Sequence, residues 1–291
     1  MSDLVSQNLN MIFKTPKGET VHALKDVNFT LKKGELLTVL GPSGCGKTTL
    51  LNITAGFIRP TSGNITLNNN EIDGPGVERG MVFQQGALFE WLTVAENVNF
   101  GLRMKKEDPV STAKKVDEWL DIVGLKGFGN TPTYQLSGGM QQRVALARCL
   151  INDPDLILMD EPLGALDALT REKMQSLVLK IWKETGKTII LITHSVEEAL
   201  LLGERLYVMA PRPGRGAITY NLSPSSKASS TEWVIKIIVF PVSFQIFNTK
   251  DCIFSLVKAS RAPNGSSIKI KSGSLIRHLA RATLCCIPPD N

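Results

Sequence analysis

The stretch GPSGCGKTT, from Gly41 to Thr49, combines three glycines with a lysine and two threonines. It fits G-x-x-x-x-G-K-[ST], in which backbone N–H groups surround phosphates and the following helix adds positive potential. In such a loop the lysine reaches the β- and γ-phosphates and the first threonine hydroxyl binds Mg²⁺. The stretch therefore predicts a site for a nucleoside triphosphate and Mg²⁺, formed by Gly41, Pro42, Ser43, Gly44, Cys45, Gly46, Lys47, Thr48 and Thr49.

Two adjacent carboxylates follow a second apolar run, in LILMDEP. Asp160 ends the run and is expected to hold Mg²⁺ through water, since this ion keeps several of its waters. Glu161 is expected to polarise a water that attacks the γ-phosphate. An acidic strand end exposed to solvent would be the better interpretation of the pair alone. Together with the phosphate loop, the pair predicts an enzyme that uses nucleoside triphosphates.

Short apolar runs and helical segments alternate around these motifs. Buried parallel strands are predicted at 36–40, 156–160, 188–193 and 205–210, and helices after the phosphate loop and around 111–123, 137–151, 170–184 and 196–202. Such alternation predicts an α/β fold with a mostly parallel sheet. Residues 92–150 contain helical patterns without a clear strand, so we expect a helical insertion there.

The stretches 4–13, 21–35 and 63–72 instead show the alternation of an antiparallel sheet. Turns are expected at Lys17-Gly18, Lys33-Gly34 and Asn68–Asn70. The fold expected for residues 4–221 is therefore a P-loop NTPase core with an antiparallel β subdomain and a helical subdomain. The sequence shows no secretory signal and no apolar run that is long enough to span a membrane.

The charge is unevenly distributed over the 291 residues, although the net value is +6. Residues 1–221 carry 24 basic and 24 acidic side chains, whereas residues 222–291 carry 9 and 3. Because nucleic-acid binders usually show a basic face on the folded domain, the neutral domain argues against a nucleic-acid partner. Five scattered cysteines without a CxxC pair predict reduced thiols and no structural metal site.

A second candidate for anion binding lies in QLSGGMQQRVALARCL, where Ser137, Gly138 and Gly139 precede a helical pattern. The order of this segment with VFQQ, LMDEP, GALD and ITHS resembles the motif series of ABC-type ATPases over residues 4–215. A P-loop kinase would lack LSGG and the histidine. The resemblance implies a homodimer in which these three residues of one chain close over the ATP that its partner binds.

The same resemblance implies roles for four further residues. Gln84 contacts Mg²⁺ and the attacking water, and His194 contacts the γ-phosphate. Asp167 crosses the dimer interface beside the partner's loop. Phe13 is the candidate for stacking on adenine, with ordinary core packing as an equally good interpretation.

Within the family, GPGVERGMVFQ, LTVAENVNFGL and TGKTIILITHSVEEALLLGERLYVM are similar to the taurine/nitrate/sulfonate importer ATPases. That similarity implies a peripheral protein on the cytoplasmic face of the plasma (inner) membrane. It would work with two membrane permease subunits and, indirectly, a solute-binding protein. A permease helix is expected near Leu88, Phe89 and Trp91, although a helix-packing cluster explains Trp91 equally well.

Two alternatives stay open: a non-transport ABC ATPase, and a non-functional copy with an altered C-terminus. The second is motivated by residues 222–291, where no helical or strand period lasts and the family resemblance ends. We interpret this basic segment as poorly ordered or as a change of reading frame. A regulatory or membrane-surface tail is the other interpretation.

Overall fold

The computed structural model describes residues 3–224, 232–238 and 267–271, and two sheets and six α-helices organise them. The larger sheet has the order β12-β11-β10-β9-β3-β8-β7-β6. Its strands are β3 (Leu36–Leu40), β6 (Arg79–Val82), β7 (Leu156–Asp160), β8 (Thr188–Thr193), β9 (Arg205–Met209), β10 (Gly216–Pro224), β11 (Glu232–Ile238) and β12 (Ser267–Lys271). The strands from β9 to β7 are parallel, as predicted, β6 adds a further parallel strand, and β10–β12 add an antiparallel edge.

The central strands β3, β7 and β8 are mostly apolar and almost entirely buried because both faces of this sheet are covered. Leu156 and Leu158 of β7 pack toward the antiparallel sheet and α1 (Lys47–Ala55). Ile157 and Met159 alternate with them and pack toward α4 (Gly138–Leu150), α5 (Ala168–Thr185) and α6 (Val196–Leu202). Because successive side chains of β7 point to opposite faces of the sheet, this one strand packs against the layers on both sides.

The smaller sheet confirms the antiparallel pattern expected near the N-terminus. Its order is β2-β1-β4-β5, formed by β1 (Leu4–Lys14), β2 (Thr20–Leu31), β4 (Ser62–Leu67) and β5 (Asn70–Glu71). Asn68 and Asn69 connect the last two strands with φ of 56° and 64°. Two such positive values are those of a type I′ hairpin turn, which asparagine tolerates better than most residues.

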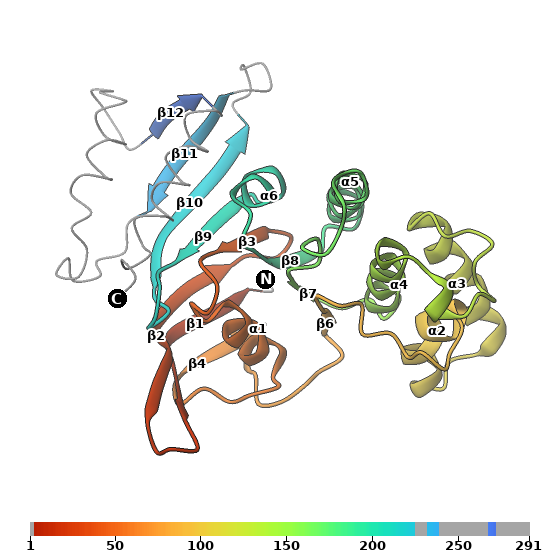
Figure 1. The fold of residues 1–291 in the computed structure, drawn as a ribbon, viewed down its shortest axis with the longest axis horizontal. Helices are drawn as coiled ribbons and strands as arrows, with labels where there is room; N and C mark the ends of the chain where they lie inside the picture. The colour runs from red at the N-terminus through yellow and green to blue at the C-terminus, as the bar shows by residue number, and fades with distance from the viewer. Residues whose placement is uncertain (1–2, 225–231, 239–266, 272–291) are drawn as a thin grey trace.

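Helices fill the segment between β6 and β7 and form a cluster of their own at one side of the molecule (Figure 1). They are α2 (Val94–Met104), α3 (Pro109–Ile122) and α4, with a separate hydrophobic core that includes Val98, Leu120 and Val144. Helix α2 begins at a complete capping box, because Thr93 and Glu96 each accept from the other's backbone N–H. This capping box therefore fixes the start of α2.

Four strands of the large sheet were not expected from the sequence. β6 is only four residues long and lies beside glycines, which weakens its pattern. β10 runs from the end of the expected domain into the 222–291 segment, and β11 and β12 lie within that segment, where we expected no lasting period. Their formation depends on pairing with a neighbouring strand, which is a tertiary effect. The rest of the 222–291 segment lies outside the described residues. Within those ranges, the structure contains no helix whose length and hydropathy suit a membrane crossing.

The buried strand β7 should control the stability of the whole domain. Leu158 is fully buried in it. Leu158→Ala is expected to lower the free energy of unfolding by about 2–5 kcal/mol, because the neighbouring layers cannot fully close the cavity. Equilibrium urea unfolding measures this loss. Leu201→Ala is the matched control, since Leu201 is 48% exposed on α6. Equal losses for both variants would contradict the assigned layering.

Candidate functional site

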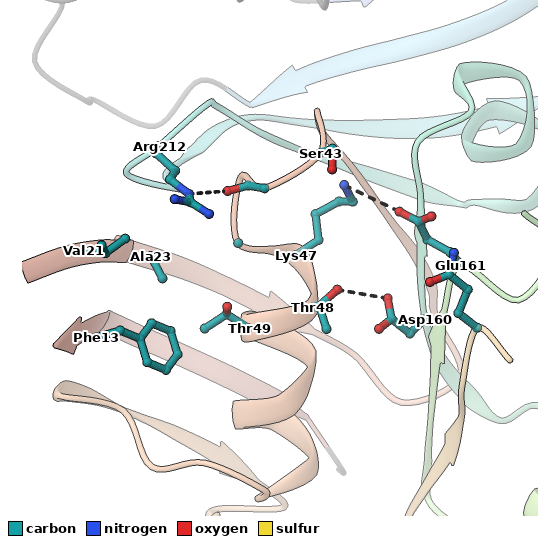
Figure 2. A pocket seen from close by; sticks show the side chains of 13 residues that line it. Phe13, Val21, Ala23, Ser43, Lys47, Thr48, Thr49, Asp160, Glu161 and Arg212 are labelled. Atoms are coloured by element: carbon teal, nitrogen blue, oxygen red, sulfur yellow. Dashed lines mark hydrogen bonds and ion pairs between the residues drawn. The ribbon is translucent and has the colours of Figure 1, made fainter. Parts of the chain in front are cut away.

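A cavity of about 380 Å³ lies where β3 passes into α1, beside the ends of β7 and β2 (Figure 2). It brings together segments that are far apart in the sequence, including the phosphate loop, Gln84 and the two carboxylates that the motifs predicted. The lining residues are Phe13, Val21, Ala23, Ser43, Gly44, Gly46, Lys47, Thr48, Thr49, Gln84, Asp160, Glu161 and Arg212.

Lys47 is the buried cation of this cavity. Its side chain is 5% exposed, and its ammonium donates hydrogen bonds to the carbonyls of Gly41 (2.8 Å) and Pro42 (3.1 Å). The Glu161 carboxylate lies 3.8 Å from the same ammonium. A charge buried this far needs such partners, and it exerts a strong field on anions that enter the cavity.

The phosphate loop around Lys47 is shaped by glycine. Gly46 has φ of 103°, and a Cβ at this position would lie 2.6 Å from the carbonyl oxygen of Ala23. Only glycine therefore allows the loop to pass this close to β2. The Cys45 side chain points into the core, where burial raises the pKa of its thiol. Cys45 can therefore contribute to the loop through its backbone only.

Thr48 and Asp160 face each other across the cavity floor. The Thr48 hydroxyl donates to Asp160 Oδ1 at 3.3 Å. Burial is the main cause that raises the pKa of the Asp160 carboxyl, and the neighbouring Glu161 adds to it. A desolvated carboxylate beside a hydroxyl offers the hard oxygen ligands that Mg²⁺ prefers, so these two residues fit a magnesium site.

Glu161 is held in an unusual backbone conformation. Its φ is 44°, which a residue with a side chain rarely adopts, and its N–H donates to the Ile192 carbonyl of β8. His194, just after β8, approaches with its Nδ1 at 3.1 Å from Glu161 Oε2. Because a carboxylate only accepts, the proton of this hydrogen bond belongs to the imidazole.

Gln84 and Phe13 both line the cavity. Phe13 is 40% exposed and belongs to none of the hydrophobic clusters, so core packing does not account for it. The backbone carbonyl of Gln84 accepts from the side chain of Gln142, which is 4% exposed on α4. This contact ties the cavity to the helical segment, and the sequence had not singled out Gln142.

The structure leaves the second predicted anion site outside this cavity. Ser137 is exposed and caps α4, where its hydroxyl accepts from Met140 N–H. Asp167 is also exposed and caps α5. The side-chain hydrogen bond with Thr170 is the main cause that lowers the pKa of Asp167. Gly138 is exposed and Gly139 is buried, and a Cβ at Gly139 would lie 2.3 Å from Thr170 Cγ2.

A charged network connects the loop before Asp167 with the segment after His194. Arg171 donates to the carbonyls of Leu163 (3.4 Å) and Leu166 (2.7 Å). Its guanidinium also lies 3.6 Å from the Glu198 carboxylate. Glu198 is buried and accepts from the Thr193 hydroxyl at 2.6 Å. Arg171 thus links the loop before Asp167 to α6, which follows His194. The spacing of the motifs alone does not reveal this link.

A parallel sheet, a glycine loop with a buried lysine, and two carboxylates at the end of β7, which β8 separates from β3, define the site of a P-loop NTPase. The sequence model of the ABC transporter family matches residues 24–164. Together with the relatives described next, this match shows that the chain belongs to the ABC transporter family, in which it is a nucleotide-binding, ATP-hydrolysing subunit.

Two curated relatives carry the same name. A taurine import ATP-binding protein of Pelagibacter ubique is 94% identical over 222 residues, which cover 76% of this chain and 84% of the relative. One of Roseobacter denitrificans is 71% identical over 222 residues, with 76% and 83% covered. About a quarter of this chain therefore lies outside each match.

A solved structure with a similar fold is the dimeric ATP-binding cassette MJ0796 in a post-hydrolysis state, bound to ADP and Pi. It is 35% identical to this chain and has a TM-score of 0.67. The alignment covers 75% of this chain and 98% of that chain.

The raised pKa of Asp160 predicts how this carboxyl changes the stability of the folded chain with pH. A carboxyl whose pKa is raised by folding destabilises the folded state once it ionises, and protonation relieves that penalty. Without Mg²⁺ and nucleotide, Asp160→Asn should therefore raise the melting temperature at neutral pH while it abolishes ATPase activity. The gain should shrink as the pH falls toward the pKa of the carboxyl. Thermal unfolding between pH 5 and about 8 tests the trend, and a gain that grows toward low pH would contradict it.

Proposed function

We propose that this chain is the ATPase subunit of an importer that takes up taurine, and that related sulfonates or nitrate are further candidate solutes. The observation that carries the proposal is the 94% identity with a taurine import ATP-binding protein, over most of both chains. A non-transport role has no comparable support. The catalytic domain in this proposal covers residues 4–221, and residues 222–291 form an atypical C-terminal segment.

In the proposed reaction, Glu161 accepts a proton from the water that attacks the γ-phosphate, and the bond to the β-phosphate oxygen breaks to give ADP and phosphate. Lys47 neutralises charge on the β- and γ-phosphates, and His194 holds the Glu161 carboxylate. Mg²⁺, when bound by Thr48 and Asp160 with Gln84 nearby, would offset phosphate charge. The contacts of Lys47 and His194 with Glu161 support these roles.

We further propose a homodimer in which ATP is enclosed between two chains. The support is the position of Ser137, Gly138, Gly139 and Asp167 away from the Lys47 cavity of their own chain. Free N–H groups at the start of α4 suit phosphate oxygens, and a partner chain can present them. Dimers are also described for the similar cassette MJ0796.

Two permease subunits would bind at the apolar surface beside Gln84. Trp91 is 79% exposed, and its ring lies 5.4 Å from that of Phe89, whereas Leu88 packs against the core. Arg148 stacks over Phe89 and also lines a neighbouring cavity of about 490 Å³, whose rim carries Val77, 72% exposed. Exposed aromatic and aliphatic side chains of this kind suit a partner helix.

The proposed location follows from these partners. The chain would be held peripherally at the cytoplasmic face of the plasma membrane by its permease, and a separate solute-binding protein would deliver the solute. Reconstitution with a taurine permease and its binding protein in liposomes tests the proposal. Labelled taurine should accumulate only with ATP, and parallel assays with other sulfonates and nitrate define the solute range. ATP hydrolysis without uptake of any of these solutes would refute the proposed role.

The role of Glu161 predicts a large loss in one variant. Glu161→Gln should lower kcat by about 10²–10⁴-fold, because the amide cannot take the proton of water. ADP binding should stay within a factor of two of wild type. The measurements are ATPase rates of the assembled complex and ADP titration. An unchanged ATPase rate would show that another group activates the water.

The shared sites predict complementation between two inactive chains. Lys47→Ala removes the phosphate cation, and Ser137→Glu places a negative charge where the partner's phosphate is expected. Each variant alone should lack ATPase activity. Mixed dimers keep one intact site, made of Lys47 from one chain and Ser137 from the other, so mixing should restore activity. The double variant mixed with either single variant is the control. No recovery on mixing, despite dimer exchange, would argue against shared sites.

A further inference from the structure

Arg212 lines the nucleotide cavity although no motif includes it. It lies in the segment that follows β9, far along the chain from the phosphate loop. Its Nε donates to the carbonyl of Gly44 at 2.8 Å. Figure 2 shows the guanidinium on the side of the loop where Val21 and Ala23 lie, whereas Lys47 points the other way, toward Glu161.

The backbone that carries Arg212 is fixed against the site. Gly214 donates its N–H to the Ala23 carbonyl at 3.0 Å and accepts from Lys25 N–H at 2.9 Å. A Cβ at Gly214 would lie 2.0 Å from the Cys45 carbonyl oxygen, so the segment runs directly over the phosphate loop. The Arg212 side chain therefore starts from a defined position, which favours a specific contact over a general charge effect.

In the described part of the chain, four of the five guanidinium N–H groups have no acceptor, and Arg212 lines the cavity. Arginine has five N–H groups, and the Gly44 carbonyl takes only the one on Nε. Within the residues that the structure describes, no carboxylate forms an ion pair with Arg212. Its Nη2 lies 3.5 Å from the position of a Cβ on Gly44, beside the loop. An anion in the cavity would be the natural acceptor for these groups.

We propose that Arg212 is a nucleotide-binding residue that contacts the α-phosphate and ribose side of the nucleotide, the part that ATP and ADP share. This inference rests on the proposed assignment of the cavity to the nucleotide. Arg212 lies on the side of the cavity where Val21 and Ala23 lie, away from the Lys47–Glu161 pair, and this position separates it from the expected γ-phosphate site (Figure 2).

The test compares nucleotide binding by the purified full chain and its variants. Arg212→Ala should weaken binding of ADP and of the β,γ-imido analogue of ATP by the same factor, about tenfold, as expected for one charge-assisted hydrogen bond. KM for ATP should rise in parallel while kcat stays unchanged. Arg212→Lys should lie between wild type and alanine, because one ammonium cannot bond Gly44 and the nucleotide in the same way.

Arg59→Ala is the matched control. Arg59 is exposed and its Nε also donates to a backbone carbonyl, that of Asp73 at 3.3 Å, but it does not line the cavity. It should bind ADP like wild type. Unchanged ADP binding in Arg212→Ala, or an equal loss in both variants, would overturn the inference. A fall in kcat without any change in affinity would also overturn it, because Arg212 would then only support the conformation of the phosphate loop. A wild-type chain that binds no ADP would overturn the nucleotide site itself.

Discussion

The buried ammonium of Lys47 is the interaction on which the site depends. A lysine that is almost fully buried requires acceptors around it, and the loop supplies two backbone carbonyls while β7 supplies the Glu161 carboxylate. These partners come from two parallel strands that end at the same edge of the sheet. The position of the charge therefore fixes how the strands, the loop and α1 must meet.

Parallel order in the sheet explains why two carboxylates lie beside the loop. β3 pairs with β8, and β8 pairs with β7, so the carboxyl ends of all three strands meet at the cavity. His194 follows β8 and reaches Glu161, and Asp160 faces Thr48 at the start of α1. The grouping of Asp160, Glu161 and His194 is thus a consequence of strand order, and burial raises the pKa of Asp160.

Polar side chains on two helices connect the cavity and its surroundings to the rest of the molecule. Gln142 on α4 holds the carbonyls of Phe83 and Gln84, so the helical segment contacts the site at its edge. Arg171 on α5 joins the loop before Asp167 to Glu198 on α6. Movement of α4 would therefore shift Gln84, and movement of α5 would shift the segment after His194. Such contiguous networks are the physical requirement for coupling between a nucleotide site and a distant partner.

The sequence by itself determined the phosphate loop, the two carboxylates, the parallel strands and the antiparallel sheet. Each of these depends on local properties: glycine at positive φ, a run of buried aliphatic residues, or alternation along one strand. Only the tertiary structure decided the short strand β6, the place of Gln142 beside Gln84, and the approach of Arg212 to Gly44. Those contacts join residues that are tens of positions or more apart, and pairing between distant segments leaves no period or spacing in the chain.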